Sequence, residues 1–152
     1  MVNEYQQRFY LPAVQRQREL LADGASEAKR LSVFHKRLKD RWKELHIEIP
    51  ESDHEGPFQV EDTFTVSAVA NLGDLKPEEV DVELYYGRMK GADELEKGYT
   101  QNMDMVEDRG DGSYLFRCTV TCRDSGRYGF TVRIGPHADD WIRFTPGLLT
   151  WA

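Results

Sequence analysis

The chain has 152 residues and a formal net charge of −7, and 39% of its residues are hydrophobic. This length suits one domain, or one small domain with an attachment, and the apolar content is sufficient to bury a core. No segment approaches the roughly 18 apolar residues of a membrane helix, and the N-terminus lacks the charged-then-apolar order of a signal peptide. We therefore expect a cytoplasmic protein that does not enter a membrane.

The charges divide into a basic first part and an acidic second part. Residues 1–45 contain 10 Lys and Arg against 6 Asp and Glu, whereas residues 46–152 contain 10 against 21. Nucleic acids and anionic membranes bind through Lys and Arg that neutralise phosphates. The acidic second part therefore argues against both as partners, and the uneven charge suggests two parts with different surroundings.

Residues 1–45 have the pattern of a helical hairpin. Asn3 is a candidate N-cap, and apolar residues then recur at helical spacing. Pro12 is expected to kink or restart this helix, because proline cannot donate a backbone hydrogen bond. Asp23 and Gly24 end it, since glycine suits the left-handed position after a helix.

A second helix follows, with Ser26 as its cap. Its apolar face is formed by Ala28, Leu31, Phe34 or His35, Leu38, Trp42 and Leu45. Two helices alone make a poor core, so this face must lie against something else. Self-association of the chain, or contact with a partner, is therefore expected here.

After Leu45 the hydrophobic period changes from about 3.6 residues to 2. Apolar and polar residues alternate over residues 46–49, 60–68, 80–84, 114–120 and 128–134. Each of these strands has one face of polar residues, which indicates antiparallel sheets with one solvent-exposed side. Asp111-Gly112 is a strong tight-turn signal. The sequence predicts an α+β fold: a helical hairpin over residues 1–45, then an immunoglobulin-like β-sandwich of six to eight strands over residues 46–152.

The stretch from Asp124 to Tyr128 resembles the tyrosine corner of such sandwiches. Gly126 lies between them, and an alternating strand follows. In a tyrosine corner the phenol bonds to nearby backbone and fixes the turn. We interpret Asp124, Gly126 and Tyr128 as structural residues. The alternative is that Tyr128 acts as a catalytic acid.

Motifs for catalysis are missing from the sequence. No glycine-rich phosphate loop opens a helix, and no Gly-x-Ser-x-Gly elbow occurs. Cys118 and Cys122 lie roughly 13 Å apart if they share one straight strand, which is too far for a disulfide. We therefore expect two free, buried thiols and no catalytic residue.

The loop after the last long strand contains His137, Asp139 and Asp140. One imidazole and one or two carboxylates are possible metal ligands, but the sequence offers no further ligand nearby and the cysteines lack zinc-site spacing. We predict no metal site.

Four aromatic residues lie in or beside predicted strands, and exposed rings there would form a platform for sugar. Core packing is the competing interpretation for each of them. The carbohydrate-binding candidates are Trp141, Trp151, Tyr85 and Tyr86.

Several segments resemble the α-glucan (glycogen/maltodextrin) phosphorylases of the long bacterial and archaeal type. "MVNEYQQRFYLPA" is similar to a segment near the end of their catalytic region. "VELYYGRM", "DGSYLFRCTV", "SGRYGFTVRIGPH" and "GLLTWA" are similar to their extra C-terminal domain. The resemblance runs in order from Met1 to Ala152, while "HADDW" departs from the family pattern.

The resemblance implies an enzyme that cleaves α-1,4-glucan with phosphate to release glucose 1-phosphate. Its pyridoxal phosphate is held by a lysine in a Lys-x-Ser-Gly-Thr-x-Gly-type segment, and nothing in this chain matches that segment. The chain is therefore expected to be a non-catalytic C-terminal part without a cofactor of its own. Its expected partners are the catalytic lobes and, through the aromatic candidates, α-glucan.

Two other interpretations remain open from the sequence. One is a stand-alone carbohydrate-binding module for neutral α-glucan, which would use exposed tryptophan at the end of a sheet. The other is a protein-interaction module that uses the apolar face of the helical hairpin.

Overall fold

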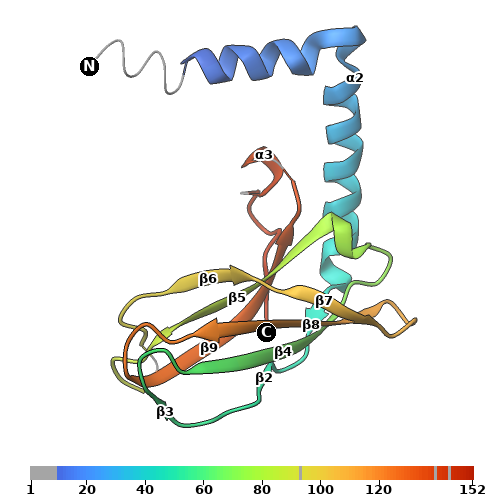
Figure 1. The fold of residues 1–152 in the computed structure, drawn as a ribbon. Helices are drawn as coiled ribbons and strands as arrows, with labels where there is room; N and C mark the ends of the chain where they lie inside the picture. The colour runs from blue at the N-terminus through green and yellow to red at the C-terminus, as the bar shows by residue number, and fades with distance from the viewer. Residues whose placement is uncertain (1–9, 93, 139, 144) are drawn as a thin grey trace. The chain divides into compact units, whose positions relative to one another are not determined.

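The computed structural model of the chain describes residues 10–152 except residues 93, 139 and 144 (Figure 1). The side chains of Asp140 and Trp141 also lie outside the description, as does the predicted N-cap Asn3. The chain divides into two compact units, one ending at Asp40 and one running from Arg41 to Ala152.

The described part of the first unit contains α2 (Leu11–Arg41), in which two helical segments meet at a kink. Residues 22–25 have non-helical backbone angles, and Gly24 has a φ of 67° there. The interruption falls where Asp23 and Gly24 predicted a helix end, because glycine adopts a positive φ at little cost. Pro12 lies in the first turn of α2.

The second unit contains short helical turns and antiparallel strands, which confirms the predicted α+β class. The helical turns are η2 (Trp42–Glu44), η3 (Pro77–Glu79) and α3 (Asp140–Arg143). The strands are β1 (His46–Ile47), β2 (Glu51–Ser52), β3 (Pro57–Phe58), β4 (Thr63–Asn71), β5 (Val80–Arg88), β6 (Tyr99–Asn102), β7 (Asp104–Asp108), β8 (Ser113–Thr121), β9 (Gly126–Pro136) and β10 (Thr150–Trp151).

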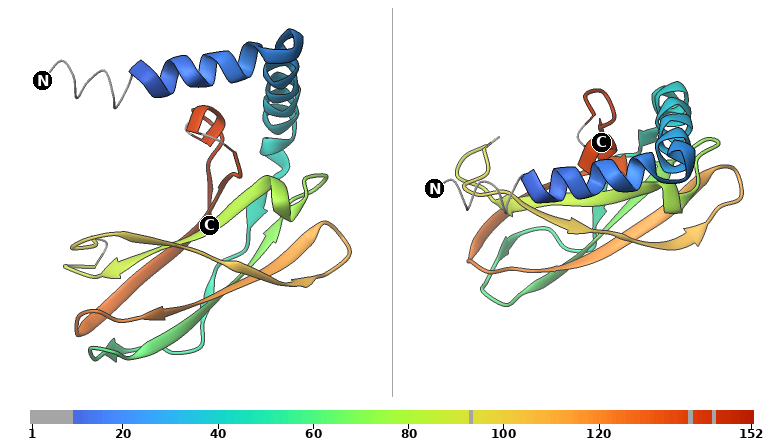
Figure 2. Two further views of the ribbon diagram at one scale, coloured as in Figure 1. Left: turned by 45° about the horizontal axis from the view of Figure 1, so that its top comes forward. Right: turned by 90° about the horizontal axis from the view of Figure 1, so that it is seen from above.

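These strands form two sheets that make a sandwich (Figure 2). In the first sheet, β4 pairs with β8 over nine residue pairs, β7 lies beyond β8, and β1 and β2 pair with the other side of β4. In the second sheet, β5 pairs with β9 over nine residue pairs, β6 lies beyond β5, and β3 and β10 pair with β9. All of these pairings are antiparallel, as the alternating sequence pattern predicted.

The core lies between the two sheets and is formed by every second residue of the long strands. On β4 the residues at even positions from Phe64 to Ala70 are buried, and on β5 the even-numbered Val82 and Leu84 are buried. Fully burying one aliphatic or aromatic side chain contributes about 1.5–3 kcal/mol to folding. This alternation fixes the strand register, since a slip of one residue would expose the whole apolar set.

The structure differs from the sequence prediction in a few places. The alternating pattern marks no strand between residues 84 and 114, but β6 begins at Tyr99 and pairs with β5. The predicted strand from residue 60 begins only at Thr63, and Val60 is exposed in the preceding turn. The described strands exceed the predicted six to eight, because four of them have only two residues, and three of these four lie outside the predicted alternating stretches.

The turn between β7 and β8 occurs at the predicted Asp111-Gly112. Gly112 has a φ of 82°, and a Cβ at this position would meet the carbonyl oxygen of Gly73 at 2.9 Å. Only glycine therefore fits this turn without a backbone shift. The Asp111 carboxylate accepts hydrogen bonds from the Ser113 N–H and hydroxyl, which holds the start of β8 in place.

Candidate functional site

The outer face of the second sheet brings together charged and aromatic residues from three neighbouring strands. Because Val82 and Leu84 point into the core, Glu83 and Tyr85 of β5 point to the outer face. Arg133 of β9 is the register partner of Glu83 on one side and of Trp151 of β10 on the other. The three-stranded register therefore sets these four side chains next to one another.

Glu83 is the centre of a largely buried ion-pair network. Glu83 is only 7% exposed, although its side chain carries a charged carboxylate. Arg133 donates to one carboxylate oxygen from Nε at 2.8 Å and from Nη2 at 2.7 Å, and Arg143 donates to the other oxygen at 2.8 Å. Both oxygens are thus satisfied, which a buried carboxylate requires.

A small cavity of about 330 Å³ lies beside this network. Its walls come from β5, β9 and the segment from Arg143 to Leu149 that leads to β10. At its border, His137 Nδ1 lies 2.8 Å from a carboxylate oxygen of Asp81. His137 is therefore engaged with a neighbouring strand.

An aromatic pair continues the same surface toward the edge strand. The ring of Trp151 contacts that of Tyr85 edge to face, with centroids 5.9 Å apart. The Arg133 guanidinium lies 5.4 Å from the centre of the Trp151 ring, within cation–π distance. Trp151 remains 44% exposed. We call the surface formed by Tyr85, Arg133, Arg143, Leu149 and Trp151 the outer-face patch.

Of the other two aromatic candidates, Tyr86 does not join this patch. Tyr86 follows Tyr85 on β5 and therefore points to the opposite face, where it is only 8% exposed and contacts Tyr99. Trp141 belongs to α3, but its side chain lies outside the described part of the structure. Among the candidates whose side chains are described, Tyr85 and Trp151 lie together.

Tyr128 has the geometry of a tyrosine corner. Its hydroxyl donates to the carbonyl oxygen of Asp124 at 3.1 Å and accepts from the Asp124 N–H at 3.2 Å. Gly126, between them, has a φ of 139°. These contacts satisfy backbone groups at the turn before β9.

The cysteine side chains are free and buried, as predicted from their spacing. Burial, together with the nearby Asp104 carboxylate, raises the pKa of the Cys118 thiol to about 11. A thiol with this pKa stays protonated at neutral pH, whereas nucleophilic cysteines react as thiolates. Cys118 therefore behaves as a small apolar core residue.

The described residues offer no cluster suited to a metal. Among them, no group of three or more His, Cys, Asp or Glu side chains is arranged to hold an ion. Of the predicted loop cluster, Asp139 and the side chain of Asp140 lie outside the described residues.

Comparison with known proteins assigns the chain to a family. Residues 42–152, well over half of the chain, match the family described as the glycogen phosphorylase C-terminal domain. The chain belongs to this family. The match begins in η2, just before β1, and so includes the whole sandwich with the outer-face patch.

Individual phosphorylases show the same relationship. The chain is 31% identical over 143 residues to the glycogen phosphorylase of Mycobacterium tuberculosis (strain CDC 1551 / Oshkosh), which covers 90% of this chain and 16% of that protein. It is 26% identical over 155 residues to the maltodextrin phosphorylase of Thermococcus litoralis, which covers 99% of this chain and 18% of that protein. The chain thus spans about one sixth of the length of these relatives.

Among the described residues, no lysine lines the cavity at the outer-face patch, so this cavity does not fit pyridoxal phosphate, the cofactor implied by the resemblance. That cofactor is held as a Schiff base on a lysine inside a pocket. All seven lysines of this chain are exposed on the surface, and none of them lines either of the cavities at the outer-face patch and at the β2–β3 edge.

Sequence reasoning missed the network around Glu83, which is the best-defined polar feature of this phosphorylase domain. Its members are 50 and 60 residues apart in the chain, so no local motif marks them.

In the portion of the chain with described structure, no helix is both long and apolar enough to cross a membrane.

Proposed function

We propose that this chain is the non-catalytic C-terminal part of an α-glucan phosphorylase and acts there as an accessory domain in the cytosol. The observation that carries the proposal is the family match over residues 42–152, combined with coverage of only 16–18% of the related phosphorylases. The catalytic portion, with the active-site positions for the glucan substrate and for phosphate, then belongs to the remaining polypeptide.

The outer-face patch is the surface that we assign to contact with the catalytic portion. Tryptophan, tyrosine and arginine are the residues most enriched among energetically dominant interface contacts. The patch presents Trp151, Tyr85 and Arg133 on one sheet and Arg143 from the neighbouring α3, with the charge of Glu83 already neutralised by the two arginines. A partner therefore meets arginine donors and apolar rings without having to desolvate a free carboxylate.

Direct contact of the same patch with α-glucan is the second candidate. Trp151 is exposed and would stack on a sugar ring, with Tyr85 beside it. The two rings meet edge to face at 83°, so they do not form the flat surface that consecutive glucose units would require. The geometry therefore favours a protein partner over a glucan at this patch.

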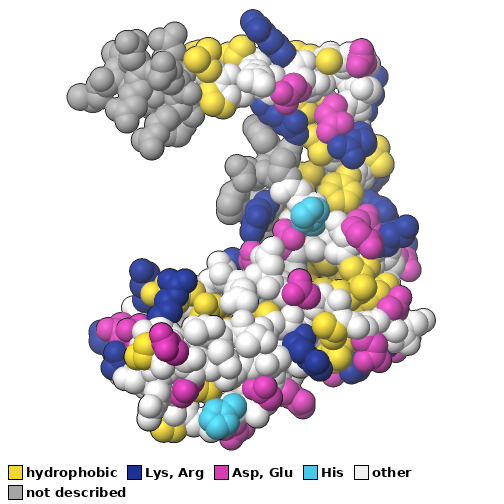
Figure 3. Space-filling model, in the orientation of Figure 1, with side chains coloured by type: hydrophobic (Ala, Val, Ile, Leu, Met, Phe, Trp, Pro, Cys, Tyr) yellow, Lys and Arg dark blue, Asp and Glu magenta, His cyan; other side chains and the backbone are white. Residues whose placement is uncertain are grey.

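The surface charge supports a neutral or protein ligand in either case. Acidic and basic side chains are interspersed over the face of the sandwich shown in Figure 3. With 21 acidic against 10 basic residues in 46–152, the domain offers phosphate or sugar phosphates an unfavourable field.

The proposal predicts that the purified 152-residue chain catalyses no phosphorolysis. Mixed with maltoheptaose and inorganic phosphate, it should release no glucose 1-phosphate, and with added pyridoxal phosphate it should form no Schiff-base absorbance band. The Mycobacterium tuberculosis relative, assayed in parallel, serves as the positive control. Turnover by the chain alone would refute the proposal.

A further inference from the structure

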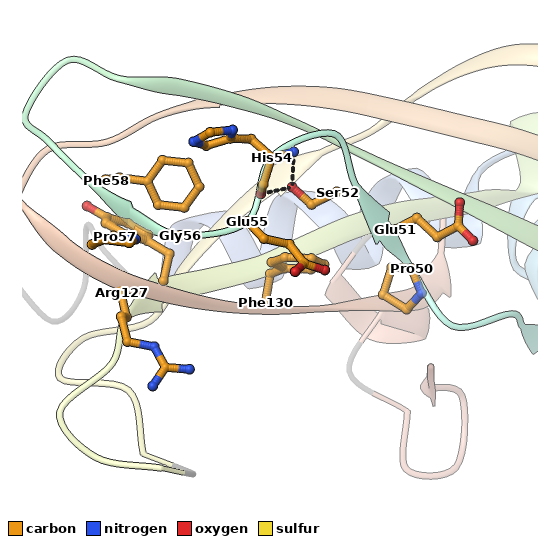
Figure 4. A pocket seen from close by; sticks show the side chains of 11 residues that line it. Pro50, Glu51, Ser52, His54, Glu55, Gly56, Pro57, Phe58, Arg127 and Phe130 are labelled. Carbon is orange, nitrogen blue, oxygen red and sulfur yellow. Dashed lines mark hydrogen bonds between the residues drawn. The ribbon is translucent and has the colours of Figure 1, made fainter.

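A second and larger cavity lies at the edge of the sandwich where the chain passes from one sheet to the other. Strand β2 pairs with β4 in the first sheet, and β3 pairs with β9 in the second. The segment from Pro50 to Phe58 that makes this crossing borders a cavity of about 810 Å³ (Figure 4). Pockets that hold small molecules have volumes of about 300–1,000 Å³.

One wall of this cavity is aromatic and belongs to the core of the sandwich. Val132 and Ile134 of β9 are completely buried, whereas Phe130, two residues before Val132 on the same inward face, is only half-buried. Phe130 contacts Phe64, with ring centroids 6.1 Å apart, and Phe64 in turn packs on Phe58 at 4.7 Å. The core is thus open at this edge and presents an aromatic ring to the cavity.

The remaining described lining is mixed, with two prolines and several polar residues, and its two carboxylates outnumber its one arginine. Figure 4 shows Glu55 and Phe130 in the middle of the cavity and Glu51 at one end. Among the residues that the structure describes, neither carboxylate has a hydrogen-bond or ion-pair partner. By contrast, Ser52 is occupied: its hydroxyl donates to the His54 carbonyl at 2.9 Å and shapes the turn.

Arg127 is the one arginine among the described residues of the lining, and it forms no ion pair with either carboxylate. Arg127 is at an odd position on β9, and odd positions on this strand point to the outer face of the sheet. Figure 4 shows its side chain directed away from Phe130. The cavity therefore disfavours anions and offers an aromatic surface together with hydrogen-bond acceptors.

We propose that this cavity binds a glucosyl segment of a neutral α-glucan, an inference that rests on the proposed function. A pyranose ring has apolar faces suited to Phe130, and its hydroxyl groups donate hydrogen bonds that Glu51 and Glu55 accept. Such a ligand uses both properties of the cavity, whereas a phosphate or sugar phosphate would be repelled. The binding is weak, with a dissociation constant on the order of 1 mM, because few groups take part.

Two-dimensional ¹H–¹⁵N NMR of the full chain tests this site with maltoheptaose as the probe, titrated to about 10 mM, well above the expected dissociation constant. We expect saturable shifts of the amides of residues 51–58 and 126–131. Glu55→Ala should weaken binding about tenfold, because it removes a charged hydrogen-bond acceptor. Phe130→Leu should also weaken it, since leucine fills the space but cannot stack. Glu107→Ala, on the exposed strand β7, is the matched control and should bind like the wild type.

Three outcomes would overturn the inference. The first is the absence of shifts in a well-folded chain, and the second is shifts confined to residues of the outer-face patch. The third is a response to spermidine, a cation, but not to maltoheptaose, which would make the cavity a cation site. The titration uses only the isolated chain. A negative titration would therefore refute the glucan site without bearing on association with a catalytic portion. Conversely, a failure of that association would not change the result of the titration.

Discussion

Glu83→Ala is expected to destabilise the sandwich by about 3 kcal/mol, because it leaves two arginines without their carboxylate. Removing one partner of a buried ion pair typically costs about 3–5 kcal/mol. The lower end applies here, since Arg143 is 42% exposed and regains water, while Arg133 is more enclosed. Urea unfolding followed by tryptophan fluorescence should show a lower midpoint with an unchanged slope.

The appropriate control for Glu83→Ala is Glu107→Ala, which removes an exposed carboxylate from edge strand β7. Exposed substitutions of this kind change stability by no more than about 0.5 kcal/mol. A double variant, Glu83→Leu with Arg133→Leu, should recover much of the loss, because apolar replacement of a buried pair is often neutral. A Glu83→Ala protein as stable as the control would show that the network contributes nothing.

Trp151→Ala is expected to weaken association with the catalytic portion of the phosphorylase about 30-fold. Central aromatic residues of interfaces contribute about 2 kcal/mol or more, which corresponds to this factor. Trp151 also holds the Arg133 guanidinium over its ring, so its loss frees a second contact residue. The measurement is a binding titration of each variant against the catalytic portion.

Val106→Ala provides the control for this titration. Val106 is exposed to a similar extent as Trp151, but it lies on β7 of the other sheet. Its loss should leave the affinity unchanged, and both variants should unfold at the wild-type temperature. Equal affinities for Trp151→Ala and the wild type would exclude the outer-face patch as the interface.

The long strands of the sandwich could be predicted from the sequence, because each of them alternates over four or more residues. Strand β7 could not, since all five of its residues are exposed and the pattern therefore carries no period. The two-residue strands β2, β3 and β10 are set by their partners β4 and β9, and local sequence does not mark them, whereas β1 falls in the predicted alternating stretch 46–49.

The functional surfaces were less predictable than the fold. Alternation alone places Tyr85 and Tyr86 on opposite faces, so the sequence contained the reason why only one of them reaches the outer face. The ion pairs of Glu83 depend on strand register and on a loop 60 residues away. The opening beside Phe130 depends on where the segment from Pro50 to Phe58 leaves the sheet edge. The alternating sequence of β9 does not show whether that edge of the core is open or covered.

The most direct measurement for the central claim is the association of the wild-type chain with the catalytic portion of the phosphorylase from the same organism, produced without the region matched here. Sedimentation velocity or NMR should follow the titration up to about 1 mM, the effective concentration that a short covalent link provides. The account predicts a saturable complex with one chain per catalytic portion. Two components that remain separate over this whole range would contradict it.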